Sequence, residues 1–309
     1  MNAPSTGRGP AASSPSMLDL VRLSPRRLFP PGGEPLYRQI ALLTGMAEPD
    51  EVLDVGSGRG VSLEYFVREH GVHGSGIEGD ARLVELSEAR AREVGVSDRL
   101  QVQSAPADAL PYRDEIFDIT VGELGMTSSA DPATAVRELV RVTRPGGSVV
   151  LIQLVWKAPV DPERRAVLGE HLGVQPLMLV EWKRLLKGSG VVDLHTEDWT
   201  DDETAFRPRV AKPFPDFAEL FSIWEKVGIL RRVFRRWGWQ GVRAVLARER
   251  SVRRLLNRER ILGLNLLMGT RAGVPASSGV PSDSGVPADS GEPPADDPSL
   301  DLFPDGPVA

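Results

Sequence analysis

The chain has 309 residues, of which 41% are hydrophobic, and this is enough for one sizeable α/β domain with appendages. It contains no cysteine, which excludes disulfide bonds, cysteine-ligated zinc, iron–sulfur clusters and thiolate nucleophiles. The net charge of −6 belongs to the C-terminal end, because residues 273–309 hold seven acids and no base, whereas residues 1–272 hold 36 acids and 37 bases.

The two ends of the chain differ in composition from its middle. Residues 1–16 and 273–309 are rich in Pro, Gly and Ser, and variants of SGVPAD repeat in the second segment with a period of about six. Such segments have too little apolar area to offset the entropy lost on ordering, so we expect both to be disordered. The start lacks the apolar region of a secretory signal, and no run of 18 apolar residues predicts a transmembrane helix. We therefore expect a cytoplasmic protein.

Helical and strand-like patterns alternate along the middle of the chain. In the helical segments apolar side chains recur every three or four residues, as Leu36, Ile40 and Leu43 do in the first. In chain order the patterns predict a helix at 34–45, a strand at 51–55, a helix at 61–70, a strand at 73–79, a helix at 80–95, strands at 99–104 and 116–122, a helix at 131–147, a strand at 147–156, a helix at 178–190, a strand at 191–200, helical structure at 214–260 and a strand at 261–271.

Capping residues place two of these helices. Asp80 is the expected N-cap of one helix, which Gly95 ends. Asp131 and Pro132 begin another, which we expect to end in Pro-Gly-Gly. Strands that alternate with helices predict βαβ units with right-handed crossovers. The predicted fold class is α/β: a doubly wound, mostly parallel seven-stranded sheet with helices on both faces, a helical insertion before the last strand and a disordered C-terminal tail.

The segment EVLDVGSGRGVS, residues 51–62, places a glycine loop between a strand and a helix. Gly56, Gly58 and Gly60 are spaced G-x-G-x-G, so Val61 occupies the third glycine position of the dinucleotide pattern G-x-G-x-x-G. No G-x-x-x-x-G-K-S/T motif occurs either. The loop is therefore better suited to an adenosine ligand without phosphates than to a pyrophosphate, which argues against an NAD-dependent oxidoreductase.

Two acids near this loop indicate the chemistry of its ligand. Asp54, at the end of the first strand, would repel a pyrophosphate and would suit a ligand with a cationic amino group. Glu78 follows Gly56 by 22 residues, at the end of the second strand. A carboxylate at that position can accept hydrogen bonds from both hydroxyls of a ribose.

Five motifs occur in a fixed order: VLDVGSGRG, GIEGD, ADALPY, FDITVGELGM and LVRVTRPGGSVVLI. Together they resemble the successive motifs of class I, Rossmann-like S-adenosylmethionine-dependent methyltransferases of the small-molecule type, with a methyltransferase type 11-like domain. The resemblance covers about residues 34–156 and extends loosely to residue 271. It implies an N-terminal helical lid at 17–50, a cofactor-binding core at 51–156 and a substrate region at 157–272.

The resemblance also implies a site for S-adenosyl-L-methionine. Glu78 would bind the ribose, and Tyr37 lies on the helix that often covers the cofactor in this family, although core packing is the alternative role for this tyrosine. The other expected cofactor-site residues are Asp54, Gly56, Ser57, Gly58 and Gly60 around the methionine part, Ala107 and Asp108 at the adenine, and Glu123 and Leu124 beside the methyl-transfer site.

The implied reaction is in-line methyl transfer to a small or medium-sized organic acceptor. The sulfonium already activates the methyl group, so neither a metal nor a covalent nucleophile is required, and the four histidines show no metal-ligand spacing. A neutral oxygen or carbon nucleophile would need a general base, for which Glu123, His171 and His195 are the candidates. The absence of an N/D-P-P-Y/F motif after the fourth strand argues against methylation of nucleobases.

An arginine-rich segment leaves an alternative function open. Residues 226–260 hold twelve bases and two acids, interleaved with Phe234, Trp237 and Trp239. Such a segment could bind an anionic substrate, nucleic acid or an anionic lipid surface, or it could be a solvated helix face. The alternative to an enzyme is a non-catalytic S-adenosylmethionine-binding module that engages a partner or nucleic acid through this segment.

Overall fold

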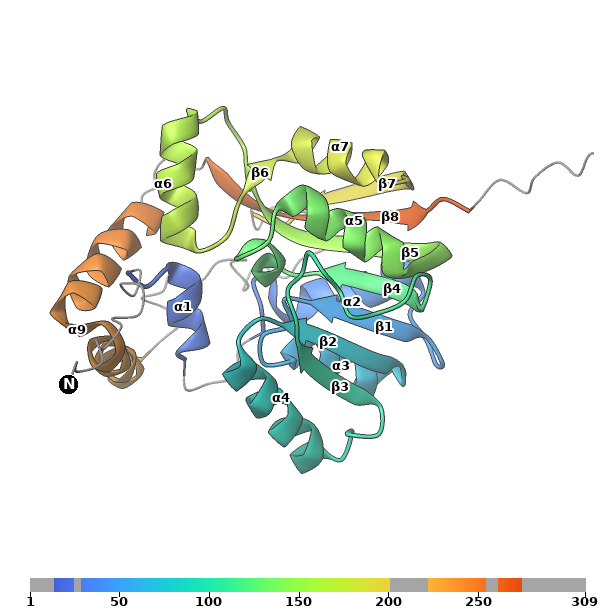
Figure 1. The fold of residues 1–309 in the computed structure, drawn as a ribbon, viewed down its shortest axis with the longest axis horizontal. Coiled ribbons are helices and arrows are strands. Elements are labelled where there is room, and N and C mark those ends of the chain that lie inside the picture. Colours follow the sequence, from blue (N-terminus) through green and yellow to red (C-terminus); the bar gives the residue numbers. More distant parts are fainter. Residues whose placement is uncertain (1–13, 25–28, 201–221, 254–260, 274–309) are drawn as a thin grey trace, which may run out of the picture. The chain divides into compact units, whose positions relative to one another are not determined.

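The computed structural model describes residues 14–24, 29–200, 222–253 and 261–273 (Figure 1). The described residues all belong to one compact unit, which ends at Gly273, and residues 274–309 lie outside the described residues. The expected disorder of 1–13 and 274–309 therefore stays a prediction. It does not extend to Ser16, which caps the first helix through a reciprocal pair of hydrogen bonds with Asp19.

One eight-stranded sheet forms the centre of the fold, with the order β3-β2-β1-β4-β5-β8-β7. Strands β1 to β5 are parallel along this path, and β8 runs antiparallel between β5 and β7. The strands are β1 Glu51–Val55, β2 His73–Glu78, β3 Leu100–Ser104, β4 Phe117–Gly122, β5 Thr143–Trp156, β6 Leu177–Met178, β7 Val191–Asp198 and β8 Leu262–Arg271. This confirms the predicted α/β class and the seven predicted strands. The unpredicted β6 pairs with the end of β5, and its two residues are too few to show a pattern.

Helices cover both faces of the sheet, because the strands are apolar on both sides. They are α1 Met17–Arg22, α2 Gly33–Thr44, α3 Val61–His70, α4 Ala81–Val94, the 3₁₀ helix η1 Leu124–Thr127, α5 Pro132–Val142, α6 Pro162–Leu172, α7 Leu179–Gly188 and α9 Ile223–Arg253. Leu36, Phe66 and Val84 of α2, α3 and α4 pack in the cluster on one face. Leu139 of α5 and Trp182 of α7 pack in the cluster on the other.

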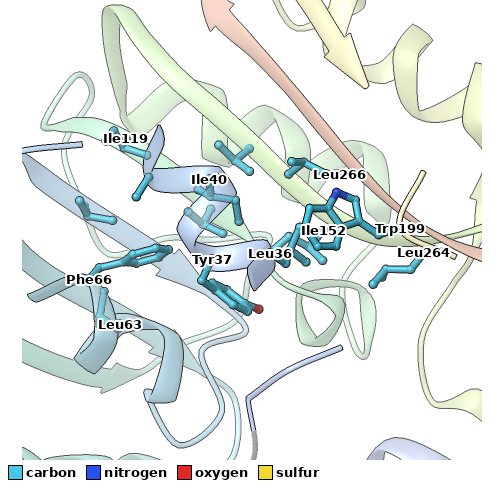
Figure 2. Packing of buried hydrophobic residues seen from close by; sticks show 14 of the residues in the cluster. Leu36, Tyr37, Ile40, Leu63, Phe66, Ile119, Ile152, Trp199, Leu264 and Leu266 are labelled. Atoms are coloured by element: carbon cyan, nitrogen blue, oxygen red, sulfur yellow. The ribbon is translucent and has the colours of Figure 1, made fainter. Parts of the chain in front are cut away.

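The first of these clusters fixes α2 against the sheet. Figure 2 shows Leu36, Tyr37 and Ile40 of α2 within it, with Phe66 of α3 to one side and Leu266 of β8 towards the other. These side chains are fully buried. Burial of side chains of this size stabilises the fold by about 1.5–3 kcal/mol each, so α2 is an integral part of the core.

The boundary between α5 and β5 differs from the prediction of a helix up to residue 147. The helix ends at Val142, and β5 already begins at Thr143, whose backbone is extended. The Thr143 hydroxyl donates to the Leu139 carbonyl at 2.7 Å, which satisfies a free carbonyl at the helix end. Pro145 disfavours helical backbone at the residue before it, so the chain leaves the helix earlier than Gly146 and Gly147 suggest.

Helix α6 was not expected, although it carries the same start signal as α5. Asp161 is its N-cap and Pro162 its first residue. Only Leu168 and Leu172 of α6 are buried, and this sparse pattern did not indicate a helix. The expected helical segment 214–260 is represented by α9, which kinks at Gly238, whereas 214–221 and 254–260 lie outside the described residues. In the described part of the chain, no helix is both long enough and apolar enough to span a membrane.

The cap of α5 gives a direct test of local stability. The Asp131 carboxylate accepts hydrogen bonds from the backbone N–H and the hydroxyl of Thr134, both at 2.9 Å. Asp131→Ala should lower the free energy of unfolding by about 1 kcal/mol at pH 7, and Asp131→Asn by much less, because Asn still accepts a bond. Urea denaturation measures both. Equal losses in the two variants would contradict the cap.

The same cap should depend on pH. The backbone hydrogen bond from Thr134 lowers the pKa of Asp131 below its usual value of 3.8. Its stabilising effect is therefore complete above the pKa of the unfolded chain and is lost as the pH falls through the lower folded-state pKa. The difference between wild type and Asp131→Ala should accordingly shrink below about pH 4.

Candidate functional site

The candidate site lies at the carboxyl edge of the parallel strands, where the order of the sheet reverses. From β1 the chain continues on one side to β2 and β3, and it returns to the other side of β1 as β4. Such a switch point opens a crevice outside the strand ends, which is where ligands bind in open α/β sheets. Helices α1, α6 and α9 stand over this edge in Figure 1. The expected site residues on β1, β2 and β4 therefore converge there.

The glycine loop after β1 has the backbone that the spacing predicted. Gly56, Gly58 and Gly60 all have positive φ, at 83°, 57° and 64°. A Cβ on Gly56 would lie 2.6 Å from the backbone nitrogen of Met126 in η1, so this position allows two backbone segments to meet. A Cβ on Gly58 would meet nothing within 4 Å. The requirement for glycine at 58 is thus conformational, and the space beside it is open.

Asp54 is a fully buried carboxylate at the end of β1. Its Oδ2 accepts a hydrogen bond from the Ser62 hydroxyl at 2.7 Å, whereas Oδ1 is buried without a partner among the described residues. Burial raises the pKa of Asp54 to about 7, and repulsion from Glu78 adds to the rise against the opposing Ser62 bond.

A second buried carboxylate, Glu123, follows β4 and lies next to the end of β1. Its backbone N–H donates to the Val55 carbonyl at 2.9 Å, and its Oε1 accepts a hydrogen bond from the Tyr37 hydroxyl at 2.5 Å. Its Oε2 is buried and unpartnered within the described structure. Burial first, and then the charge of Asp54, raise the pKa of Glu123 well above its usual range. The Gln153 amide on β5 donates to the Glu123 carbonyl and fixes this turn.

The orphaned oxygens of Asp54 and Glu123 indicate what this place can hold. A buried carboxylate oxygen without a hydrogen bond costs about 1–3 kcal/mol or more. Burial and the charge of a neighbouring acid raise the pKa of each of the two. A bound cation or hydrogen-bond donor would relieve this cost. A ligand with a positive charge or an ammonium group therefore fits the residues present. The described residues contain no group of three or more His, Cys, Asp or Glu that could hold a metal ion.

Glu78 ends β2 and contacts the glycine loop directly. The Gly58 N–H donates to its Oε2 at 3.0 Å, and the Asp80 N–H donates to its Oε1 at 3.0 Å. Arg22 of α1 also donates to Oε1 at 3.0 Å, and the Glu78 side chain is only 1% exposed. Arg22 was missed at the level of sequence, because the two residues are 56 positions apart.

The remaining expected cofactor residues have distinct environments. Ser57 is nearly buried, and its hydroxyl lies 3.4 Å from the Ile77 carbonyl. Ala107 is buried and Asp108 half-buried, shortly after β3, whose last residue pairs with Glu78. Leu124 packs against the first core cluster.

The two histidines proposed as bases are not brought to this centre. His195 lies on β7, away from β1 and β4, and its Nε2 contacts the Glu197 carboxylate at 3.0 Å. His171 lies in the last turn of α6, where Nδ1 is buried without a described partner. Burial, together with the charge of Arg248, lowers the pKa of His171. Of the three candidates, only Glu123 is placed beside the cofactor-site residues.

A cavity of about 960 Å³ lies over the end of β2. It reaches from Glu78 to Thr127 and Ser128 at the end of η1, to Gln175, and to Arg22 of α1. Asp54 and Glu123 are not among the residues that line it, and both are buried. Glu78 lines the cavity and also interacts electrostatically with the buried Asp54, so it connects the cavity with the buried acids.

Arginine side chains donate hydrogen bonds to backbone carbonyls on both sides of α1. Arg59 of the glycine loop donates to the Ser24 carbonyl at 2.6 Å, and Arg232 of α9 donates to the Leu23 carbonyl at 3.0 Å. Arg248 donates to the Ser14 carbonyl at 2.6 Å. Leu23 and Ser24 follow the C-terminal end of α1, where carbonyls lack intrahelical partners and cations are favoured. These contacts fix α1 beside the cavity, which Leu18, Asp19 and Arg22 of α1 line.

Comparison with known proteins shows what this arrangement is similar to. Residues 53–151 match the family described as "Methyltransferase domain". An uncharacterized protein of Haemophilus influenzae is 28% identical over 184 residues, which cover 57% of this chain and 72% of that protein. Methyltransferase GfsG of Streptomyces halstedii is 30% identical over 154 residues, which cover 50% of this chain and only 52% of GfsG.

Solved structures show the same fold. A phosphoethanolamine N-methyltransferase of Haemonchus contortus, in complex with S-adenosyl-L-methionine, has a TM-score of 0.61 at 15% identity over 83% of this chain and 57% of that one. The [4+2]-cyclase SpnF has a TM-score of 0.58 at 20% identity over 77% of this chain and 80% of that one. At this identity the likeness shows the fold alone, and the second name shows that one fold hosts different chemistries.

The buried acid at the end of β1 gives a test that needs no ligand. Because the folded-state pKa of Asp54 is raised, the folded protein binds a proton more tightly than the unfolded chain, and stability falls as the pH rises from about 4 to about 7. Asp54→Asn removes this cost and keeps an acceptor for Ser62. The variant should therefore gain thermal stability relative to wild type at pH 8, and the gain should shrink at pH 5.

Thermal unfolding at several pH values measures this difference. The matched control is Asp98→Asn, which changes an exposed acid on the same protein and should follow the wild-type curve. A loss of stability in Asp54→Asn at pH 8 would contradict the inference that the buried, ionised carboxylate destabilises the fold.

Proposed function

We propose that this protein, whose residues 53–151 match the methyltransferase domain family, is a class I, Rossmann-like S-adenosylmethionine-dependent methyltransferase that methylates a small or medium-sized organic acceptor. The observation that carries the proposal is the pair of buried carboxylates, Asp54 and Glu123, each with an orphaned oxygen beside the glycine loop. When bound, S-adenosyl-L-methionine supplies an electrophilic methyl group on a sulfonium, and it also carries an ammonium group. These cationic groups match the two acids.

The chain's own residues have separate parts in holding the cofactor. Glu78 accepts hydrogen bonds from the ribose hydroxyls, and the open space beside Gly58 admits the nucleoside. Ala107 and Asp108 face the adenine, and Asp54 with Glu123 neutralises the cationic end. Because Arg22 already occupies Glu78 Oε1, ribose binding at that oxygen requires Arg22 to move.

Methyl transfer needs alignment more than it needs acid–base chemistry. Holding an acceptor in line with the methyl group and excluding water contributes up to about 7–11 kcal/mol in well-oriented cases. Tyr37 positions Glu123 through its short hydrogen bond, and Gln153 fixes the Glu123 backbone. For an acceptor that must lose a proton, Glu123 is the base that the geometry favours, since its Oε2 is unpartnered and its raised pKa makes the ionised carboxylate a stronger base than an ordinary one.

The polar wall of the cavity supports a small acceptor. Thr127, Ser128 and Gln175 present hydroxyl and amide groups, and the volume of about 960 Å³ suits a small or medium-sized molecule beside the cofactor. The names of several similar proteins also contain small acceptors, such as geranyl diphosphate in a C-methyltransferase of Streptomyces coelicolor. A chain that only binds the cofactor, without turnover, is the second candidate, and the same experiments separate the two.

Cofactor binding is tested at Glu78. Calorimetric titration with S-adenosylhomocysteine should show binding to the wild type. Glu78→Ala should weaken it by one to two orders of magnitude, because a hydrogen bond to a charged group contributes about 1.5–3 kcal/mol. Glu78→Gln should lie between. The control is Glu85→Ala, an exposed acid on α4, which should bind as the wild type does.

Two outcomes would overturn the cofactor site: no heat with the wild type, or unchanged affinity in a Glu78→Ala variant that melts as a folded protein. The loss is specific to the ligand only if circular dichroism shows the same fold in all variants. Circular dichroism before and after each titration provides that check.

Turnover is tested with a cofactor that carries an isotopically labelled methyl group. Incubated with cell extract, the wild type should generate a product heavier by one labelled methyl substituent. If Glu123 takes the proton, Glu123→Gln should generate this product more slowly even at saturating cofactor, where a loss of cofactor affinity no longer limits the rate. Mass spectrometry of the small-molecule fraction measures the product. Tight cofactor binding with no labelled product across extracts would favour the binding module.

A further inference from the structure

Helix α9 has two apolar faces, and among the described residues one is buried and the other is exposed. On the inner face Ile229, Val233 and Val245 are buried against Leu20 and Leu23 of α1. In Figure 1 α9 lies beyond α1, at the outer side of this part of the molecule. The other face carries large apolar side chains that are exposed: Trp224 by 83%, Trp239 by 70%, Val227 by 52%, Phe234 by 44% and Leu246 by 44%.

These exposed side chains line up with arginines at helical spacing. Before the kink, Trp224, Val227, Arg231 and Phe234 recur at intervals of three or four residues. After the kink at Gly238, the same intervals connect Trp239, Arg243, Leu246 and Arg250. Residues at these intervals share one side of a helix. The rings of Phe234 and Trp239 join the two stretches, with centroids 5.2 Å apart in an edge-to-face contact.

Cations predominate among the described charged side chains of α9. Arg231, Arg235, Arg243 and Arg250 are exposed, whereas Arg232 and Arg248 reach carbonyls next to α1. Among the α9 side chains that the structure describes, Glu225 is the only acid. The face therefore combines aromatic and aliphatic groups with cations, which is the pattern of a helix that lies in the plane of a membrane surface.

We propose that the outer face of α9 docks on an anionic lipid surface. Trp and Phe rings are favoured at the level of lipid headgroups, and arginine side chains place their charge in the headgroup region while their stems cover apolar area. Each arginine near an anionic surface contributes about 1 kcal/mol. The proposal goes beyond the methyltransferase activity and does not depend on it, since docking is measured without cofactor.

Single-stranded nucleic acid fits the same face less well. Bases stack on aromatic rings, and arginines bind phosphates, so Trp224, Trp239 and the arginines suit either partner. Val227, Leu246 and the 75% exposed Ile223 decide between them, because aliphatic side chains have no base to stack on but are removed from water in a lipid interface.

Docking would also bring the lipid surface close to α1 and to the cavity beside it. Arg232 on α9 holds the Leu23 carbonyl, and the adjacent Arg22 contacts Glu78. Arg236 of α9 lines the cavity. Contact of α9 with lipid would therefore act on elements that cover the cofactor site.

Vesicle flotation with the full chain tests the proposal. At about 0.15 M salt, the wild type should float with vesicles of phosphatidylcholine and phosphatidylglycerol (about 3:1) and not with phosphatidylcholine alone. Trp224→Ser with Trp239→Ser should reduce binding by at least about tenfold. Arg231→Gln with Arg235→Gln should reduce it by roughly fivefold per arginine.

Matched controls change similar groups elsewhere on the surface. Leu42→Ser removes a 71% exposed apolar side chain from α2, and Arg92→Gln removes an exposed cation from α4, and both should bind as the wild type does. Thermal melts confirm that every variant is folded. No flotation of the wild type, equal flotation with neutral vesicles, or undiminished flotation of the double variants would each overturn the proposal. Binding to a single-stranded RNA oligonucleotide without binding to vesicles would overturn it as well.

Discussion

The burial of two carboxylates at the end of neighbouring parallel strands is the constraint on which the rest of the structure depends. Asp54 and Glu123 leave water when β1 and β4 pair, and the protein supplies each of them with only part of its hydrogen bonds. Ser62 and Tyr37 satisfy one oxygen of each acid. What remains is one oxygen of each acid without a partner among the described residues, and a cationic ligand would favour the ionised form that burial disfavours.

Several features of the fold follow from keeping this place buried and ordered. Tyr37 reaches Glu123 only because α2 is packed into the core between α3 and β8, as Figure 2 shows. At Gly56 the glycine loop packs directly against η1. Arg59 and Arg232 donate hydrogen bonds to the carbonyls that follow α1. A site assembled from elements so far apart in the chain can be rigid, because each of its side chains is fixed by the core rather than by a free loop.

The strand-and-helix pattern and the glycine spacing were sufficient to predict the sheet, the loop and its two acids, because these depend on local periodicity and on where parallel strands end. The contacts that complete the site were beyond that reasoning. Tyr37 and Glu123 are 86 positions apart, and Arg22 meets Glu78 through a six-residue helix with little pattern. Side chains such as Gln153 reveal their role only once β5 lies beside β4. Long-range pairing, rather than propensity, decides such contacts.

The most direct test of the central claim is the number of protons released when the cofactor binds at pH 6.5, obtained by calorimetry in buffers of different ionisation enthalpy. Asp54, with a pKa of about 7, is mostly protonated at that pH in the free protein, and an arriving cation should drive the proton off. The account predicts release of a large fraction of one proton, reduced in Asp54→Asn. Proton uptake, no exchange, or a release that Asp54→Asn and Glu123→Gln leave unchanged would contradict it.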